Sequence, residues 1–165
     1  MEVLRSADDL VAKTEYTAIT AWLLVNENKS VQYTIAETVK GHPGRSQTQH
    51  IALLVDDIAA TVTAMKSRSV EFLTIPDSYY EILKERLSHS KLDFSGDVEL
   101  LKQHQILMDF DDHGYLLQIF TKPVQDKPTL FFEIIQRRNF DGFGAGNFKS
   151  LFEAVEREQK RRGTL

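Results

Sequence analysis

Three short apolar segments, separated only by turns, dominate the second half of the chain and limit what it can fold into. They are Ile106–Phe110, Tyr115–Thr121 after an Asp-Asp-His-Gly turn, and Leu130–Arg137 after a proline-containing loop. Each has the length and the content of aliphatic and aromatic residues that are typical of a strand. The pattern therefore predicts a β-sheet that is closed by three successive strands.

The stretch before these strands predicts alternating strands and helices. Strands are expected at His50–Val55 and Val70–Ile75, and helices at 58–69, Asp77–His89 and, more briefly, Glu99–Lys102. Two aspartates precede the first helix and can cap it, because their side-chain oxygens accept hydrogen bonds from its free N–H groups. From residue 50 onward the predicted order is β-α-β-(α)-β-β-β-α, which is an α+β fold.

The two ends of the chain carry weaker signals. Residues 1–13 are polar and mixed and predict a frayed entry, whereas residues 14–40 contain two strand-like runs around an Asn-Glu-Asn-Lys turn and predict a hairpin. Gly142, Gly144 and Gly146 precede a last helix, for which Asn147 is a plausible N-cap. This glycine spacing differs from that of a dinucleotide-binding loop and favours a hinge or close packing.

Composition excludes several classes of function. The 165 residues include 20 Lys+Arg and 24 Asp+Glu, so the formal charge is −4 and no positive field favours nucleic acid. Cysteine is absent, which excludes thiolate catalysis, zinc fingers and iron–sulfur clusters. No apolar run has membrane-spanning length and the first residues lack a signal-peptide pattern. We expect a single cytoplasmic domain without a membrane or nucleic-acid partner.

Polar residues interrupt three of the apolar strand segments. Glu133 lies within Phe-Phe-Glu-Ile-Ile, Gln118 lies within Leu-Leu-Gln-Ile-Phe, and His50 opens the first strand. A buried carboxylate needs a cation, a donor or a proton. Two plain interpretations stay open, an exposed glutamate and a structural histidine. The alternative is that histidine and carboxylate belong to a 2-His-1-carboxylate Fe(II) site, which needs one further histidine.

Five motifs in the same order resemble the C-terminal half of the 4-hydroxyphenylpyruvate dioxygenases, from about Thr14 to the end of the chain. The motifs are Gln-His-Ile-Ala-Leu at 49–53, Ser-Tyr-Tyr at 78–80, Leu-Leu-Gln-Ile-Phe at 116–120, Phe-Phe-Glu-Ile-Ile-Gln-Arg at 131–137 and Gly-Phe-Gly-Ala-Gly-Asn-Phe at 142–148. These enzymes belong to the vicinal-oxygen-chelate superfamily, whose βαβββ modules form half-barrels around a metal. The resemblance implies a complete module at 49–137, a hairpin from an incomplete preceding module, and a gating helix at 142–165.

The same resemblance implies an Fe(II) enzyme of tyrosine and phenylalanine catabolism that converts 4-hydroxyphenylpyruvate and O2 to homogentisate and CO2. It assigns His50 and Glu133 to the metal. It assigns Gln118 to catalysis and to the substrate pocket, together with further pocket residues: Gln49, Phe120, Phe143, Asn147 and Phe148.

The chain also departs from the family pattern. The family's first metal histidine lies ahead of the hairpin, where residues 1–13 contain no histidine, and His42 is a displaced candidate. A serine and a Pro-x-Asn that contact the substrate in the family are replaced by Ala21 and by Thr34-Ile35-Ala36. Hydroxymandelate synthase, or another 2-oxo acid dioxygenase, therefore stays an alternative activity.

Two further alternatives concern the missing histidine and the missing N-terminal half of the family enzyme. The chain can be a non-catalytic metal- or ligand-binding module, since two ligands hold a metal less tightly than three. It can also be complemented by another chain, as a homo-oligomer or by pairing with the missing half, because an unpaired sheet edge invites a partner.

Overall fold

The computed structural model consists of two compact units, residues 1–46 and 47–165, and each is described by itself. The residues whose structure is described are 2–5, 12–13, 18–28, 30–38, 48–125, 130–142 and 144–147. The boundary between the units lies in the loop that the sequence places between the hairpin and the complete module. The organisation of both units as one catalytic-type domain stays a prediction.

The first unit is a four-stranded antiparallel sheet built around one central strand. Its members are β1 (Glu2–Arg5), β2 (Ala12–Lys13), β3 (Ala18–Val25) and β4 (Gln32–Thr38). β3 and β4 form a hairpin at the positions that the sequence predicts. The structure differs from the frayed entry expected at 1–13, because β1 and β2 both pair with β3. The second edge of β3 would otherwise leave its backbone N–H and C=O groups unpaired.

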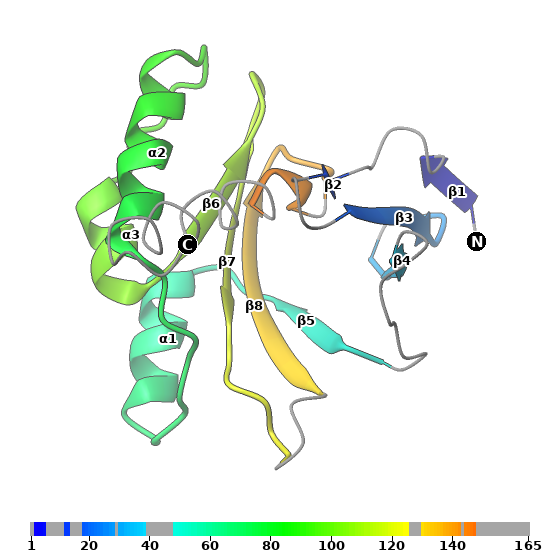
Figure 1. Ribbon diagram of the computed structural model, residues 1–165, viewed down its shortest axis with the longest axis horizontal. Helices are drawn as coiled ribbons and strands as arrows, with labels where there is room; N and C mark the ends of the chain where they lie inside the picture. Colours follow the sequence, from blue (N-terminus) through cyan, green and yellow to red (C-terminus); the bar gives the residue numbers. More distant parts are fainter. Residues whose placement is uncertain are drawn as a thin grey trace. The chain divides into compact units, whose positions relative to one another are not determined.

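The second unit contains a mixed four-stranded sheet with the order β5-β8-β7-β6 (Figure 1). Its strands are β5 (His50–Leu54), β6 (Leu107–Phe110), β7 (Tyr115–Phe120) and β8 (Phe131–Arg138). β6, β7 and β8 are antiparallel neighbours, as short connections require, whereas β5 runs parallel to β8. β5 therefore forms one edge of this sheet.

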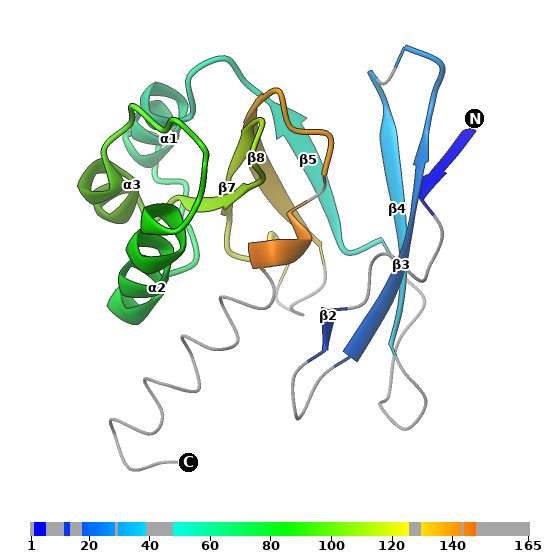
Figure 2. The same ribbon diagram turned by 90° about the horizontal axis from the view of Figure 1, so that it is seen from above.

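Three helices cover one face of this sheet (Figures 1 and 2). They are α1 (Ile58–Lys66), α2 (Asp77–Ser88) and α3 (Val98–His104). Asp57 caps α1 as predicted, since its Oδ1 accepts a hydrogen bond of 2.9 Å from the N–H of Ala60. The Oε1 atom of Gln136 accepts a second bond, of 2.9 Å, from the N–H of Ile58 and ties α1 to β8. No helix in the described part of the chain is long and apolar enough to span a membrane.

The strand predicted at Val70–Ile75 is reduced to one bridge, between Phe72 and Thr121. The Oε1 atom of Gln105 accepts the N–H of Ile75 at 2.6 Å, and Pro76 has no N–H to donate. Pairing with β7 therefore cannot extend along the segment. With this correction, the order β5-α1-β6-β7-β8 is that of the predicted βαβββ module, and α2 and α3 are inserted between α1 and β6.

Alternation of side chains gives the sheet two chemically different faces. Ile134, Leu117 and Ile119 point toward the helices and join the hydrophobic core. Glu133 and Gln118, one position away along β8 and β7, point to the opposite face and are nevertheless buried. Two polar side chains that are buried outside the hydrophobic core need partners, and these partners make up the candidate site.

Candidate functional site

His50 and Glu133 meet on the face of the sheet opposite the helices. Parallel pairing places His50 beside Phe131 and Ala52 beside Glu133, so the histidine and the carboxylate lie on the same face of neighbouring strands. The Nε2 atom of His50 is 3.2 Å from the Oε2 atom of Glu133. The Glu133 side chain is 8% exposed and that of His50 is 30% exposed. The carboxylate is thus held inside the protein while the imidazole reaches its surface.

Gln49 orients the imidazole. Its Oε1 atom lies 3.1 Å from the Nδ1 atom of His50, so Nδ1–H can donate to it. In this tautomer Nε2 keeps its lone pair and faces a carboxylate oxygen, which is also an acceptor. Two acceptors at this distance need a proton or a metal cation between them. A histidine whose second nitrogen is hydrogen-bonded in this way is typical of metal ligands.

The spacing of the two donor atoms suits a metal ion. Ligand atoms about 2.1 Å from a metal and at right angles to each other are about 3.0 Å apart, close to the observed 3.2 Å between His50 and Glu133. The described residues contain no group of three or more His, Cys, Asp or Glu side chains that could hold a metal. His42 lies outside the described residues. The pair therefore fits two positions of a metal site.

Two aromatic rings contact the imidazole. Phe131 stacks on His50 with ring centroids 5.1 Å apart, and Phe120 approaches it edge-on at 6.5 Å. The two phenylalanines contact each other at 5.7 Å. Phe120 was predicted as a site residue, whereas Phe131 was not. The signal for Phe131 is its position two residues before Glu133, which puts both on one face of β8.

Gln118 extends the same face toward the turn that follows β8. In the register of β7 and β8, Phe120 lies opposite Glu133, and Gln118 lies two residues before Phe120. The Oε1 atom of Gln118 accepts a hydrogen bond of 2.9 Å from Nδ2 of Asn147. Gly144 packs directly on this amide with a φ of +88°, and a Cβ atom there would overlap Oε1. The close-packing role predicted for the glycines is thus confirmed at Gly144.

A second layer of buried polar groups, not predicted from the sequence, holds this turn. The hydroxyl of Tyr79 on α2 donates to Oδ1 of Asn147 at 2.7 Å and accepts from the N–H of Met108 at 2.8 Å. Oδ2 of Asp109 accepts the N–H of Gly146 at 3.0 Å. Tyr79 lies within the Ser-Tyr-Tyr motif, but its place on the apolar stripe of its helix is that of a core residue.

Burial of two tyrosines predicts a loss of stability in alkali. Desolvation, the largest cause, raises the pKa of both Tyr79 and Tyr80. Above pH about 10, the ordinary tyrosine pKa, the unfolded chain releases these protons and the folded chain keeps them. The free energy of unfolding should therefore fall by up to about 1.4 kcal/mol per pH unit for each tyrosine.

Urea unfolding between pH 8 and 11 measures this slope. Tyr79→Phe and Tyr80→Phe should each make it shallower, because each removes one proton that only the unfolded chain releases. A slope that neither substitution changes would contradict the assignment to these tyrosines.

The structure thus brings together most of the predicted site. Gln49, His50, Phe120 and Glu133 form one cluster, and Gln118 is linked to Asn147. Phe143 and Phe148 lie outside the described residues, as does the chain after Asn147 that was predicted as a gating helix. Only residues 145–147 of that helix are described, as one helical turn.

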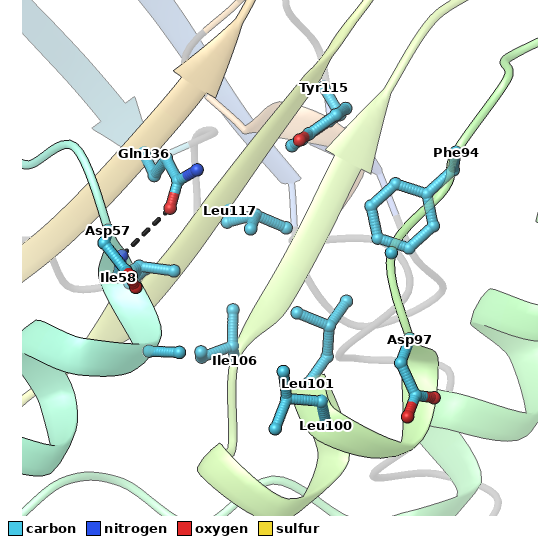
Figure 3. A pocket seen from close by; sticks show the side chains of 12 residues that line it. Asp57, Ile58, Phe94, Asp97, Leu100, Leu101, Ile106, Tyr115, Leu117 and Gln136 are labelled. Carbon is cyan, nitrogen blue, oxygen red and sulfur yellow. Dashed lines mark hydrogen bonds between the residues drawn. The ribbon is translucent and has the colours of Figure 1, made fainter.

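A separate pocket of about 140 Å³ lies on the other face of the sheet, between the sheet and the helices (Figure 3). Figure 3 shows Gln136 pointing toward the start of α1 at its rim, with Tyr115, Leu117 and Ile106 across from it. None of the predicted site residues lines this pocket. Its lining is mainly apolar, and its two carboxylates, Asp57 and Asp97, accept backbone N–H groups at the starts of α1 and α3.

Three comparisons with known proteins bear on the site. A family model described as the Glyoxalase/Bleomycin resistance protein/Dioxygenase superfamily matches residues 1–86. A putative protein of Caenorhabditis elegans is 60% identical over 97% of this chain and 47% of its own length. The 4-hydroxyphenylpyruvate dioxygenases of Dictyostelium discoideum and Danio rerio are 48% and 46% identical over 97% of this chain. The matches cover 47% and 43% of the length of these two enzymes, so this chain spans about half the length of the curated relatives it matches.

A solved structure has a similar fold. A mutant of 4-hydroxymandelate synthase from Streptomyces coelicolor superimposes with a TM-score of 0.75 and 34% identity, over 96% of this chain and 46% of that one. A fusion of a xylose isomerase-like TIM barrel with a 4-hydroxyphenylpyruvate dioxygenase matches with a TM-score of 0.53 and 33% identity, over 67% of this chain and 17% of that one.

Proposed function

This chain belongs to the Glyoxalase/Bleomycin resistance protein/Dioxygenase superfamily, and from its paired His50 and Glu133 we propose that it is the metal-binding portion of a 4-hydroxyphenylpyruvate dioxygenase. The proposed reaction converts 4-hydroxyphenylpyruvate and O2 to homogentisate and CO2. The observation that carries the proposal is the 3.2 Å approach of a histidine Nε2 to a buried carboxylate oxygen, with two phenylalanine rings against the imidazole. The relatives named 4-hydroxyphenylpyruvate dioxygenase support the choice of substrate.

His50 and Glu133 would hold Fe(II), which fits their nitrogen and oxygen donors. When bound, the metal supplies Lewis acidity and the redox chemistry that a 2-oxo acid needs to react with O2. Gln49 would keep the Nε2 lone pair of His50 available by accepting a hydrogen bond from Nδ1–H. Phe120 and Phe131 cover part of the imidazole and would limit the access of water to this side of the site, which would protect reactive species from side reactions.

Polar and aromatic residues beyond the metal pair would bind the substrate. Gln118 provides a buried amide, and Asn147 fixes it by a hydrogen bond of 2.9 Å. Phe143 and Phe148 are proposed as further walls of the pocket, on the strength of the family motif alone. A planar ring between phenylalanines gains from stacked and edge-on contacts, which suits an aromatic 2-oxo acid.

The third metal ligand is proposed to come from a part of the site outside the described residues or from another polypeptide. The edge strand β5 supports a partner: Ile51, Leu53 and Leu54 are exposed by 45%, 47% and 66%. An apolar strand at a sheet edge favours pairing or covering by another segment. This proposal covers both a homo-oligomer and a pairing with a polypeptide that corresponds to the N-terminal half of the family enzymes.

The test of the proposed function is iron-dependent O2 uptake with 4-hydroxyphenylpyruvate, followed by mass spectrometry of the product. Homogentisate is expected, at a rate that follows added Fe(II) and is lost with a chelator. Uptake without any aromatic product, or uptake independent of iron, would contradict the proposal.

Hydroxymandelate synthase chemistry is the second candidate. Its support is the similarity of the fold to 4-hydroxymandelate synthase, together with Ala21, Thr34 and Ala36 at positions where the dioxygenase pattern has polar groups. Hydroxymandelate in the same assay would favour it. Anaerobic titration of the chain with Co(II) tests the non-catalytic alternative, which predicts weak binding and no turnover.

A further inference from the structure

A chain of three buried side chains connects α2 with Gln118, on the face of the sheet that carries Glu133. The Tyr79 hydroxyl lies 2.7 Å from Oδ1 of Asn147, and Nδ2 of Asn147 lies 2.9 Å from Oε1 of Gln118. Tyr79, Gln118 and Asn147 are 0%, 2% and 3% exposed. Groups buried to this extent are costly when unpaired, so the chain has a defined hydrogen-bond direction rather than an average of several.

The backbone of β6 sets this direction. The N–H of Met108 can only donate, and it donates to the Tyr79 oxygen at 2.8 Å. The hydroxyl proton is then directed to the nearest acceptor, Oδ1 of Asn147 at 2.7 Å, which is closer than the Met108 carbonyl at 3.1 Å. Burial raises the pKa of Tyr79, so the hydroxyl keeps this proton. Asn147 accordingly presents its NH2 group to Gln118.

The oxygen atom and the NH2 group of the Gln118 amide differ in their hydrogen bonding. Its Oε1 accepts from Asn147, whereas its Nε2 has no hydrogen-bond partner among the residues that the structure describes. The side chain lies on the same face of the sheet as Phe120 and Glu133. The two N–H groups of the Gln118 amide can therefore donate hydrogen bonds to an oxygen atom of a ligand.

We propose that Tyr79 is a positioning residue that fixes the Gln118 amide, through Asn147, with its NH2 group available to donate to an oxygen atom of the bound substrate. This inference rests on the proposed function and specifies its recognition. The site selects ligands that carry an oxygen with an available lone pair near Gln118, and 4-hydroxyphenylpyruvate has such oxygens at both ends, the carboxylate and keto oxygens at one and the phenol oxygen at the other. A ligand with only donors at that position is rejected.

Independent contacts hold the turn that carries Asn147. Asp109 accepts the N–H of Gly146 at 3.0 Å and that of Phe110 at 3.1 Å, and Arg86 approaches it at 3.4 Å. Removal of the Tyr79 hydroxyl therefore changes the direction of the hydrogen-bond chain without releasing the turn. This separation allows positioning to be measured apart from folding.

Tyr80 provides a matched control. It is the next residue of α2, it is 2% exposed, and its hydroxyl has no hydrogen-bond partner among the described residues. Tyr79→Phe and Tyr80→Phe remove the same atom from neighbouring buried rings, and only the first interrupts the chain.

The first experiment records the side-chain amide NMR signals of Gln118 and Asn147 in 15N-labelled protein without metal or substrate. Tyr79→Phe should shift or split both sets of signals, and Tyr80→Phe should leave them unchanged. Unchanged Gln118 signals in Tyr79→Phe would overturn the proposal. This measurement needs no turnover, so its result is independent of the proposed reaction.

The second experiment measures the affinity for 4-hydroxyphenylpyruvate in a double-mutant cycle with Gln118→Leu. Tyr79→Phe alone should weaken binding about tenfold, the order expected for one hydrogen bond. In the Gln118→Leu background it should cause no further loss, whereas a purely structural effect would be additive. Additive losses would overturn the positioning role. Shifted amide signals without any binding of 4-hydroxyphenylpyruvate would overturn the proposed function and leave the positioning role intact.

Discussion

Glu133→Ala should weaken binding of Fe(II) by about a thousandfold and abolish iron-dependent O2 uptake. The reason is that the substitution removes one of the two metal-ligating side chains that meet at this site. Each ligand of a protein metal site contributes a few kcal/mol, and each 1.4 kcal/mol is a factor of ten in affinity. Anaerobic isothermal titration with Fe(II) measures the change, and O2 uptake with 4-hydroxyphenylpyruvate measures the activity.

Two control variants bracket this effect. Gln49→Leu keeps both ligands but removes the acceptor for Nδ1–H of His50, and such changes cost about 10- to 100-fold in metal affinity. Glu71→Ala removes an exposed carboxylate that pairs with Lys122 and should leave metal binding unchanged. Equal affinities for Fe(II) in the wild-type protein and in Glu133→Ala, with both folded, would contradict the metal site.

Gly144→Ala should lower the free energy of unfolding by about 2–6 kcal/mol and disturb Gln118. Two costs add at this position. The φ of +88° is unfavourable for any residue with a Cβ atom, at about 1–3 kcal/mol. The new Cβ would also overlap Oε1 of Gln118, and overpacking of a buried site costs about 1–3 kcal/mol. Urea unfolding measures the stability.

Gly142→Ala is the matched control for that prediction. It lies in the same turn, its φ is not positive, and its added Cβ would meet the far edge of the Phe140 ring instead of a hydrogen-bonded amide. Movement of one ring should absorb the new atom at a smaller cost. An equal decrease in the free energy of unfolding for both alanine variants would contradict the prediction that the conformation of Gly144 requires glycine.

The fold class and the family could be predicted from the sequence because strand alternation and the five motifs are local signals. The fold confirms three closing strands, the capped helix after Asp57 and the βαβββ order. The strand expected at Val70–Ile75 was wrong, since the residues that interrupt its pairing include Gln105, thirty positions away. Local patterns do not report such distant side-chain acceptors.

The candidate site, like the fold, could be predicted from the sequence only in part. His50 and Glu133 stand out because polar residues within apolar strands need partners. Their mutual distance could not be predicted, because it depends on the register of two strands that are remote in the sequence. Tyr79 was missed for a related reason. Its position on an apolar helical stripe is what a core residue would show, and only the fold brings its hydroxyl to Asn147.

The parallel pairing of β5 with β8 has a consequence for how the site is assembled as the chain is made. His50 lies on the first strand of the second unit and Glu133 on its last. The helices and two other strands are synthesised between them. Pairing of the two strands closes a long loop, and the loss of chain entropy in this step slows folding because it precedes the stabilising contacts. A nascent chain therefore exposes the histidine well before the carboxylate exists beside it. Capture of the proposed metal would have to wait until the final strand has docked, which would make a bound ion a marker of completed folding.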